Sequence, residues 1–252
     1  MRENDHACAS SPANYPTTLM RALISLLAFT TVTVQAADPM PSPITAIDIL
    51  LEPDATMLRH AEAVNSNHLK IFPQGFALDA THRPHITMLQ RFVRTADLDQ
   101  LYVAVQKILT GYNVTGMKLE AFKYYYIPSK DLGLSGIVAK PTPELLKLQA
   151  DLIAAVAPFT VPSGNSDAFV TTPDDRVIDP FLIDYVSTFV PKSSGEHFSP
   201  HVTTGLAPRT YLDKLLAEPF EPFTFSPAGA AVYQLGQFGT AAKQLKVFDL
   251  KP

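Results

Sequence analysis

Two copies of one four-residue pattern limit what this chain can fold into. Pro84-His85-Ile86-Thr87 recurs as Pro200-His201-Val202-Thr203, with proline, histidine, a β-branched aliphatic residue and threonine in the same order. The second histidine follows the first by 116 residues, about half the length of the chain beyond residue 36. A pattern repeated at this distance indicates two similar substructures, each of which carries one copy.

Both copies are predicted to form strands, because β-branched residues favour strands and a proline is tolerated at a strand's first position. Residues two apart in a strand point to the same face. His85 therefore shares a face with Thr87, and His201 shares one with Thr203. If the two strands face each other across a cleft, two imidazoles and two hydroxyls meet there.

This set of groups suits chemistry on a phosphate. Imidazole has an ordinary pKa near 6.5, so one histidine can take a proton while the other gives one. The threonine hydroxyls of Thr87 and Thr203 can donate hydrogen bonds to phosphate oxygens, although strand propensity alone would also explain a threonine at either position. We predict that His85 and His201 are catalytic, and that the two threonines bind phosphate.

The beginning of the chain has the pattern of a secretory signal. Met20 and Arg21 precede an apolar run of about 13 residues that ends at Val34-Gln35-Ala36. A basic residue, a short apolar core and a small-x-small end are typical of such signals, and the run is too short to span a membrane. We expect residues 1–36 to be an upstream segment plus a signal peptide. The protein would then be periplasmic or secreted, with no membrane attachment after cleavage. A short buried helix in a cytosolic protein is the alternative.

Composition excludes several classes of function. The only cysteine, Cys8, precedes the apolar run, so neither a disulfide framework nor thiol catalysis is available after cleavage. The net charge is −4, whereas proteins that grip long nucleic acid are usually basic. A small anionic ligand remains possible, because it needs only a local positive site.

Helices and strands are expected to interleave in both halves, as in a duplicated α+β unit. The expected strands are 44–51, 84–92, 117–127, 132–139, 198–206, 223–225, 230–237 and 244–250. The expected helices are 52–69, 95–111, 143–156, 181–190 and 210–217.

A metal site is a rival interpretation of the histidines. His82 and His197 lie three and four residues before the motif histidines, and four imidazoles are able to hold zinc. However, Pro84 and Pro200 lie within these spans and disfavour a helical pair of ligands. No cysteine or obvious carboxylate partner recurs in both copies. We therefore predict no metal.

Several aromatic residues could stack on a nucleobase, although core packing is the more common role for any one of them. They are Tyr124, Tyr125, Tyr126, Tyr185, Phe189 and Tyr233.

On these motifs, the chain resembles the 2H phosphoesterase superfamily, which includes bacterial 2′-5′ RNA ligase-like and cyclic phosphodiesterase proteins. The resemblance rests on the two His-x-Thr-x motifs at His85 and His201, on the lead-in Phe198-Ser199-Pro200, and on an expected final hairpin at 231–250. It covers residues 44 to 251.

The resemblance implies an α+β fold with two pseudo-symmetric lobes, in which antiparallel sheets line a central cleft and helices lie outside. We expect one bilobal domain over 37–252, with lobe halves of about 44–140 and 141–252. The resemblance also implies that His85 and His201 act as acid and base, that Thr87 and Thr203 bind phosphate oxygens, and that no metal or other cofactor is needed. The two copies are near-equivalent, so the sequence does not decide which histidine is the acid.

The implied reaction is hydrolysis of a cyclic phosphate or a 2′-5′-type phosphodiester. We expect the substrate to be a small nucleotide or a short oligonucleotide, and the protein to be a monomer. The alternatives are a protein that binds a nucleotide without cleaving it and a metal-dependent hydrolase.

Overall fold

The computed structural model describes residues 43–173 and 175–250. The expected upstream segment and signal peptide, residues 1–36, lie outside the described residues.

The described residues form an α+β fold, which confirms the fold class expected from the sequence. The strands are β1 Ile44–Pro53, β2 Ile86–Arg94, β3 Leu119–Ser129, β4 Leu132–Ala139, β5 Thr160–Val161, β6 His201–Pro208, β7 Phe223–Phe225, β8 Pro227–Leu235 and β9 Ala241–Val247. The helices are α1 Ala55–Ile71, α2 Leu98–Leu109, α3 Pro143–Val156, α4 Pro180–Ser193 and α5 Arg209–Ala217.

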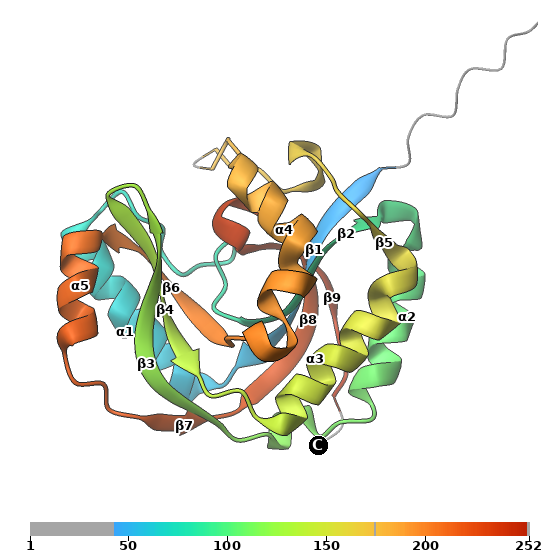
Figure 1. The fold of residues 1–252 in the computed structure, drawn as a ribbon, viewed down its shortest axis with the longest axis horizontal. Helices are drawn as coiled ribbons and strands as arrows, with labels where there is room; N and C mark the ends of the chain where they lie inside the picture. Colours follow the sequence, from blue (N-terminus) through green and yellow to red (C-terminus); the bar gives the residue numbers. More distant parts are fainter. Residues whose placement is uncertain (1–42, 174, 251–252) are drawn as a thin grey trace, which may run out of the picture. The chain divides into compact units, whose positions relative to one another are not determined.

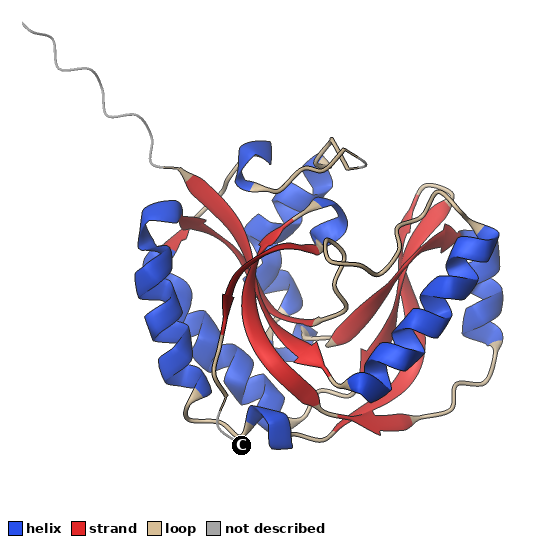
Figure 2. Ribbon diagram, turned by 180° about the vertical axis from the view of Figure 1, so that it is seen from behind, coloured by secondary structure: helices blue, strands red, loops and turns tan. Residues whose placement is uncertain are grey.

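The strands form one curled sheet in the order β7-β3-β4-β6-β2-β1-β8-β9, and β5 pairs with β2. Every pairing is antiparallel; α1, α2, α3 and α5 lie around the outside of the curl, whereas α4 lies at its centre (Figure 1 and Figure 2). The two motif strands, β2 and β6, are neighbours at the middle of the sheet. They are joined there by the single pair Ile86–Val202. The sheet therefore consists of two halves that meet at the motifs.

These halves do not correspond to the expected lobes 44–140 and 141–252. One half joins β1 and β2 to β8 and β9, and the other joins β3 and β4 to β6 and β7. The helices cross over as well, because α1 packs against β6 and α3 packs against β2. β1 pairs with β8, and β4 pairs with β6, although these strands are distant in sequence. Each half of the sheet therefore contains strands from both 44–140 and 141–252.

Local sequence explains where the helices begin. The Asp54 carboxylate accepts hydrogen bonds from the amides of Thr56 and Met57 at the start of α1, as a good N-cap does. The hydroxyl of Thr142 caps α3, whose first residue is Pro143.

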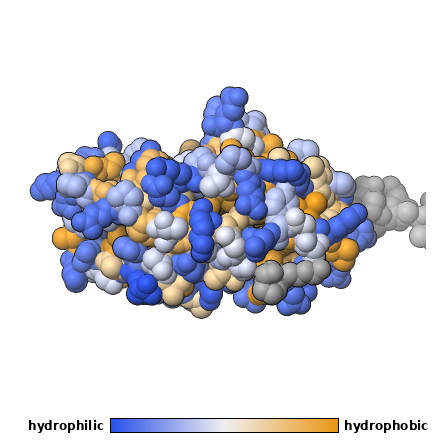
Figure 3. All heavy atoms as spheres, turned by 90° about the horizontal axis from the view of Figure 1, so that it is seen from below, coloured by the Kyte–Doolittle hydropathy of each residue, from blue (hydrophilic) through white to orange (hydrophobic). Residues whose placement is uncertain are grey.

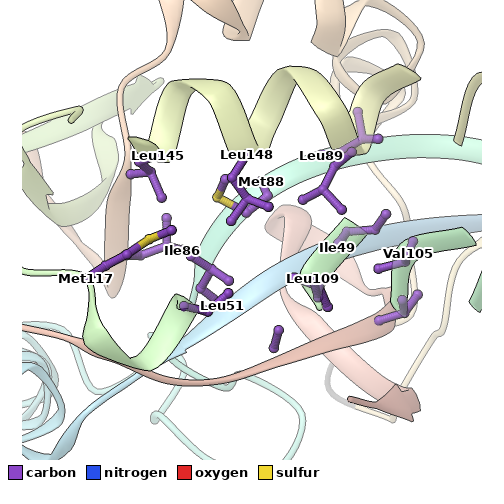
Figure 4. Close-up of a cluster of buried hydrophobic side chains, with 14 of the residues drawn as sticks. Ile49, Leu51, Ile86, Met88, Leu89, Val105, Leu109, Met117, Leu145 and Leu148 are labelled. Atoms are coloured by element: carbon purple, nitrogen blue, oxygen red, sulfur yellow. The ribbon is translucent and has the colours of Figure 1, made fainter. Parts of the chain in front are cut away.

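The core between the sheet and the helices fixes the position of the motif strands. Ile49 and Leu51 of β1 and Ile86 and Met88 of β2 are buried in a single cluster, together with the inner faces of α2 and α3. Figure 4 shows these side chains with the helical residues Val105, Leu109, Leu145 and Leu148. Burying such a side chain stabilises the fold by roughly 1.5–3 kcal/mol. Because Ile86 and Met88 face this core, Thr87 faces the other side of the sheet.

The face shown in Figure 3 mixes hydrophilic and hydrophobic residues. Within residues 43–173 and 175–250, no helix has both the length and the apolar character needed to cross a membrane.

Candidate active site

Both motif histidines are held by the same local hydrogen bond. Nδ1 of His85 lies 2.6 Å from the carbonyl oxygen of Arg83, and Nδ1 of His201 lies 2.7 Å from the carbonyl oxygen of Ser199. In each case the bond spans the proline of the motif. A carbonyl oxygen only accepts, so Nδ1 must carry the hydrogen. Each ring is thus fixed in one tautomer, with Nε2 as its reactive atom.

The four predicted site residues line a single cavity of about 310 Å³. They are His85, Thr87, His201 and Thr203. The remaining wall comes from the β3–β4 hairpin, α4 and the segment 237–239. A volume of this size lies within the range of small-molecule sites. His85 is almost fully buried, whereas His201 is partly exposed.

The two motif strands also pair with their neighbours in the same way. β1 beside β2 and β4 beside β6 each shift register by one residue just beyond the motif threonine. The equivalent pairs are Leu50–Thr87 then Asp48–Gln90 in one copy, and Gly136–Thr203 then Leu134–Leu206 in the other. The strand pairing is therefore the same in both copies. However, Asp48 and Gln90 in one copy occupy the positions that Leu134 and Leu206 occupy in the other.

Asp48 is the most unusual residue of this site. It is fully buried, and its Oδ2 lies 3.2 Å from Nε2 of His85. The same oxygen accepts hydrogen bonds from Oγ1 of Thr87 at 2.7 Å and from Nε2 of Gln90 at 3.0 Å. Oδ1 is buried without a hydrogen-bond partner among the described residues. A buried carboxylate needs such partners, because removing it from water is costly.

The surroundings shift the pKa values of the two histidines in opposite directions. Burial disfavours a charged His85, but the hydrogen bond and charge of Asp48 and the carbonyl of Arg83 outweigh burial and raise its pKa. Burial lowers the pKa of His201 to about 4. The carbonyl of Ser199 partly opposes this effect, and the charge of His85 adds to it. Both ring nitrogens of His85 face acceptors, so the imidazolium form satisfies both. The site thus pairs one imidazole whose surroundings favour the protonated form with one whose surroundings favour the neutral form.

The two threonines are also in different situations. The hydroxyl of Thr87 donates a hydrogen bond to Asp48. The hydroxyl of Thr203 faces the cavity and makes no hydrogen bond to any described residue. Only Thr203 can therefore donate to a ligand without first breaking a bond.

His82 and His197, the other two histidines of the zinc interpretation, do not line this cavity, although His82 lines a small second pocket with His85 and Thr203. His82 is buried and stacks on Phe76 at 4.5 Å, with its ring nitrogens 3.1 Å from Asp79 and 3.0 Å from Asp175. His197 is exposed in a short turn. The four histidines of the proposed zinc interpretation therefore do not converge. In the part of the chain that the structure describes, no three His, Cys, Asp or Glu side chains are grouped so that they could hold a metal ion.

The aromatic residues in the cavity are mostly not those expected. Of the expected residues only Tyr185 lines it, while the Tyr125 ring packs against His201 at 4.7 Å. Sequence reasoning missed Phe181 and Phe238, which also line the cavity. Phe181 is 66% exposed in the first turn of α4. Phe238 has a left-handed φ of 62°, a conformation that a bulky residue rarely adopts.

Asp48 and Gln90 were missed as well. A signal for Gln90 was present, because it follows His85 by five residues, where the second copy has Leu206.

Comparison with known proteins gives structural matches only. No family model and no curated protein sequence matches the chain. A Thermus thermophilus protein, TT0787, matches with 17% identity and a TM-score of 0.47 over 82% of this chain and 98% of its own. E. coli LigT bound to 3′-AMP matches with 12% identity and a TM-score of 0.41 over 83% and 100%. Kluyveromyces marxianus Usb1 matches with 9% identity and a TM-score of 0.40 over 84% and 100%.

With identities below 20% and TM-scores below 0.5, the matches do not assign an activity to this chain. Any assignment must rest on the geometry of its own site.

Proposed function

We propose that this protein is a metal-independent phosphodiesterase that hydrolyses a cyclic phosphate or a 2′-5′-type phosphodiester of a nucleotide or short oligonucleotide. One observation carries the proposal. His85 and His201, each with Nδ1 held by the carbonyl oxygen two residues earlier, line the same cavity as Thr203. Two imidazoles with their Nε2 atoms as reactive groups, one charged and one neutral, are what acid–base hydrolysis requires.

In this mechanism His201 is the base and His85 is the acid. The lone pair on Nε2 of His201 takes a proton from water, and the water oxygen attacks phosphorus. The bond from phosphorus to the ribose oxygen breaks, and Nε2–H of His85 turns from Asp48 and gives its proton to that oxygen. The products are a phosphomonoester and a free hydroxyl. Opposite pKa shifts at two neighbouring groups support this division of roles.

The threonines then have different tasks. Thr203 donates a hydrogen bond to a non-bridging phosphate oxygen. Thr87 holds Asp48 beneath His85, and it must release Asp48 if it is also to bind phosphate as the sequence predicts.

The test is turnover of 2′,3′-cyclic nucleotides and 2′-5′ dinucleotides in the presence of EDTA. We expect turnover that EDTA does not reduce, and a loss of about 10²–10⁴-fold in kcat for His85→Ala and for His201→Ala. His197→Ala, which changes an exposed histidine outside the cavity, is the matched control. Inactivity of the native protein, or undiminished turnover in both motif variants, would overturn the proposal. Tight nucleotide binding without product would instead identify a binding protein.

Solved structures of E. coli LigT with 3′-AMP, NADP+ and ATP suggest further ligands for a screen. They match this chain at only 12–14% identity, so they guide the choice of probes and nothing more.

We also propose that the protein is exported and acts as a monomer. The pattern between Met20 and Ala36 supports export. Expression of the full chain in bacteria, followed by fractionation and N-terminal sequencing, should give a periplasmic product that begins at Ala37. A cytosolic product with an intact N-terminus would contradict export.

A further inference from the structure

The wall of the cavity carries little positive charge. Among the described residues that line it, there is neither a lysine nor an arginine. The apolar share of the wall consists of Ile127, Pro128, Leu134, Phe181, Leu182, Leu206 and Phe238. Phosphate groups in proteins are usually bound by arginine or lysine. A second phosphate on the ligand would therefore meet no cation on this wall.

Two arginines near the motifs are already engaged. Arg83, two residues before His85, pairs with Glu52 at 3.4 Å. Arg209, which follows the last residue of β6, is hydrogen-bonded to Tyr126 and lies near the charge of Asp213. Recruiting either arginine to a ligand would break a contact that the folded protein already makes.

The charges of the site itself also nearly cancel. When His85 is protonated, its imidazolium faces the carboxylate of Asp48 at 3.2 Å, and burial favours the neutral form of His201. Asp179, at the start of α4, adds a negative charge to the wall. One phosphodiester charge can be met by the hydroxyl of Thr203, and by Nε2–H of His85 once it releases Asp48. Each further charge would be partly removed from water beside a wall that offers it no counter-charge.

We propose that this cavity selects phosphodiesters that carry a single negative charge and whose remaining part is uncharged. The preferred substrate class is a nucleoside 2′,3′-cyclic monophosphate with a free 5′-hydroxyl, rather than a 5′-phosphorylated nucleotide or an oligonucleotide. This inference rests on the proposed function. The uncharged base fits against the aromatic wall of Phe181, Tyr185 and Phe238, since any nucleobase can stack on an aromatic ring.

The test compares adenosine 2′,3′-cyclic phosphate with its 5′-phosphorylated form, because both present the same ring to be opened. We expect kcat/KM to be at least about tenfold lower for the 5′-phosphorylated form at low ionic strength, and the difference to shrink as salt is added. Ser129 lines the cavity at the end of β3, so Ser129→Arg places a cation on the wall. This variant should raise the relative kcat/KM of the 5′-phosphorylated form about fivefold, while Ser129→Gln, which adds bulk without charge, should not.

The outcomes separate this inference from the function on which it rests. Equal kcat/KM for the two compounds, or faster turnover of the 5′-phosphorylated form, would overturn the charge selection and leave the phosphodiesterase intact. Turnover of neither compound would overturn the proposed function. Calorimetric titration with the same two compounds would then decide the inference: weaker binding of the 5′-phosphorylated form supports it, and equal or tighter binding overturns it.

Discussion

Replacing Asp48 by asparagine tests the division of roles between the two histidines. Asparagine has nearly the same shape and keeps an oxygen that can accept from Thr87 or Gln90, so the change removes chiefly the charge. At 3.2 Å from Nε2 of His85, that charge attracts the imidazolium by about 5 kcal/mol at an effective dielectric constant of 20. The cost of desolvation offsets much of this, and a hydrogen bond to a charged group contributes a net of about 1.5–3 kcal/mol.

The loss of that net energy should lower the protonated fraction of His85, and with it kcat/KM, by roughly 10–150-fold where His85 must be charged. The loss should depend on pH. In the native protein the alkaline limb of kcat/KM reports the proton on His85, and the acidic limb reports His201, whose pKa is about 4. Asp48→Asn should move the alkaline limb to lower pH and leave the acidic limb near its native place. The ratio of native to variant activity should therefore grow from pH 5 to pH 8.

The effect of Asp48→Asn on the free energy of unfolding should also depend on pH. Because the pKa of His85 is raised by folding, its contribution is fully present below pH 6.5 and is lost as pH rises through its folded value. Asp48→Asn should thus lower the free energy of unfolding more at pH 5.5 than at pH 8.5.

The matched control is Glu52→Gln, which also converts a carboxylate on β1 to an amide but pairs with Arg83 at the surface. Its activity ratio should stay flat with pH. A flat ratio for Asp48→Asn as well, or an unchanged alkaline limb, would refute the role assigned to His85.

Two predictions concern α1. His68 is fully buried and its pKa is lowered by burial to about 4, so it stabilises the fold above pH 6.5 and loses about 3 kcal/mol of that contribution as pH falls to 4. His68→Leu should flatten the dependence of the urea unfolding free energy on pH over this range, and an unchanged slope would contradict the assignment. Asn65 is buried and bonds to the backbones of Phe76, Leu78 and Thr204, so Asn65→Ala should cost about 3 kcal/mol. Asn67→Ala, at an exposed position of the same helix, should stay within about 0.5 kcal/mol; equal losses in the two variants would show that the bonds of Asn65 do not hold the 72–85 loop.

Much of the local structure follows from the sequence, because short-range patterns determine it. Helix α3 occupies Pro143–Val156 as predicted, and its Thr142 cap, its first-turn proline and its spaced leucines are all local features of the sequence. The two motifs predicted that each histidine shares a strand face with a threonine, and the structure places all four side chains on one cavity. The alternation of side chains between the two faces of a strand depends only on the local backbone. It can therefore be predicted from the sequence without knowledge of the fold.

The pairing of distant strands could not be predicted in this way. Nothing in the sequence around β1 indicates that its free edge is completed by β8, nearly 180 residues later. For this reason the expected lobe boundary near residue 140 fails to divide the sheet. The same limit hid Asp48, whose importance arises only because β1 pairs with β2 and sets it opposite Gln90. An aspartate in a strand, taken alone, is simply a residue with low strand propensity.

The difference between the two halves also accounts for how the site would return to its starting state. In the proposed mechanism His85 is neutral after giving its proton to the leaving oxygen, and the carboxylate of Asp48 at 3.2 Å favours taking a proton back. After taking a proton from water, His201 is charged in a half of the site where Leu134 and Leu206 replace the polar pair. Apolar neighbours disfavour that charge and favour its release. Each histidine is thus driven back toward the protonation state in which it began, by the residues that break the symmetry of the repeated motif.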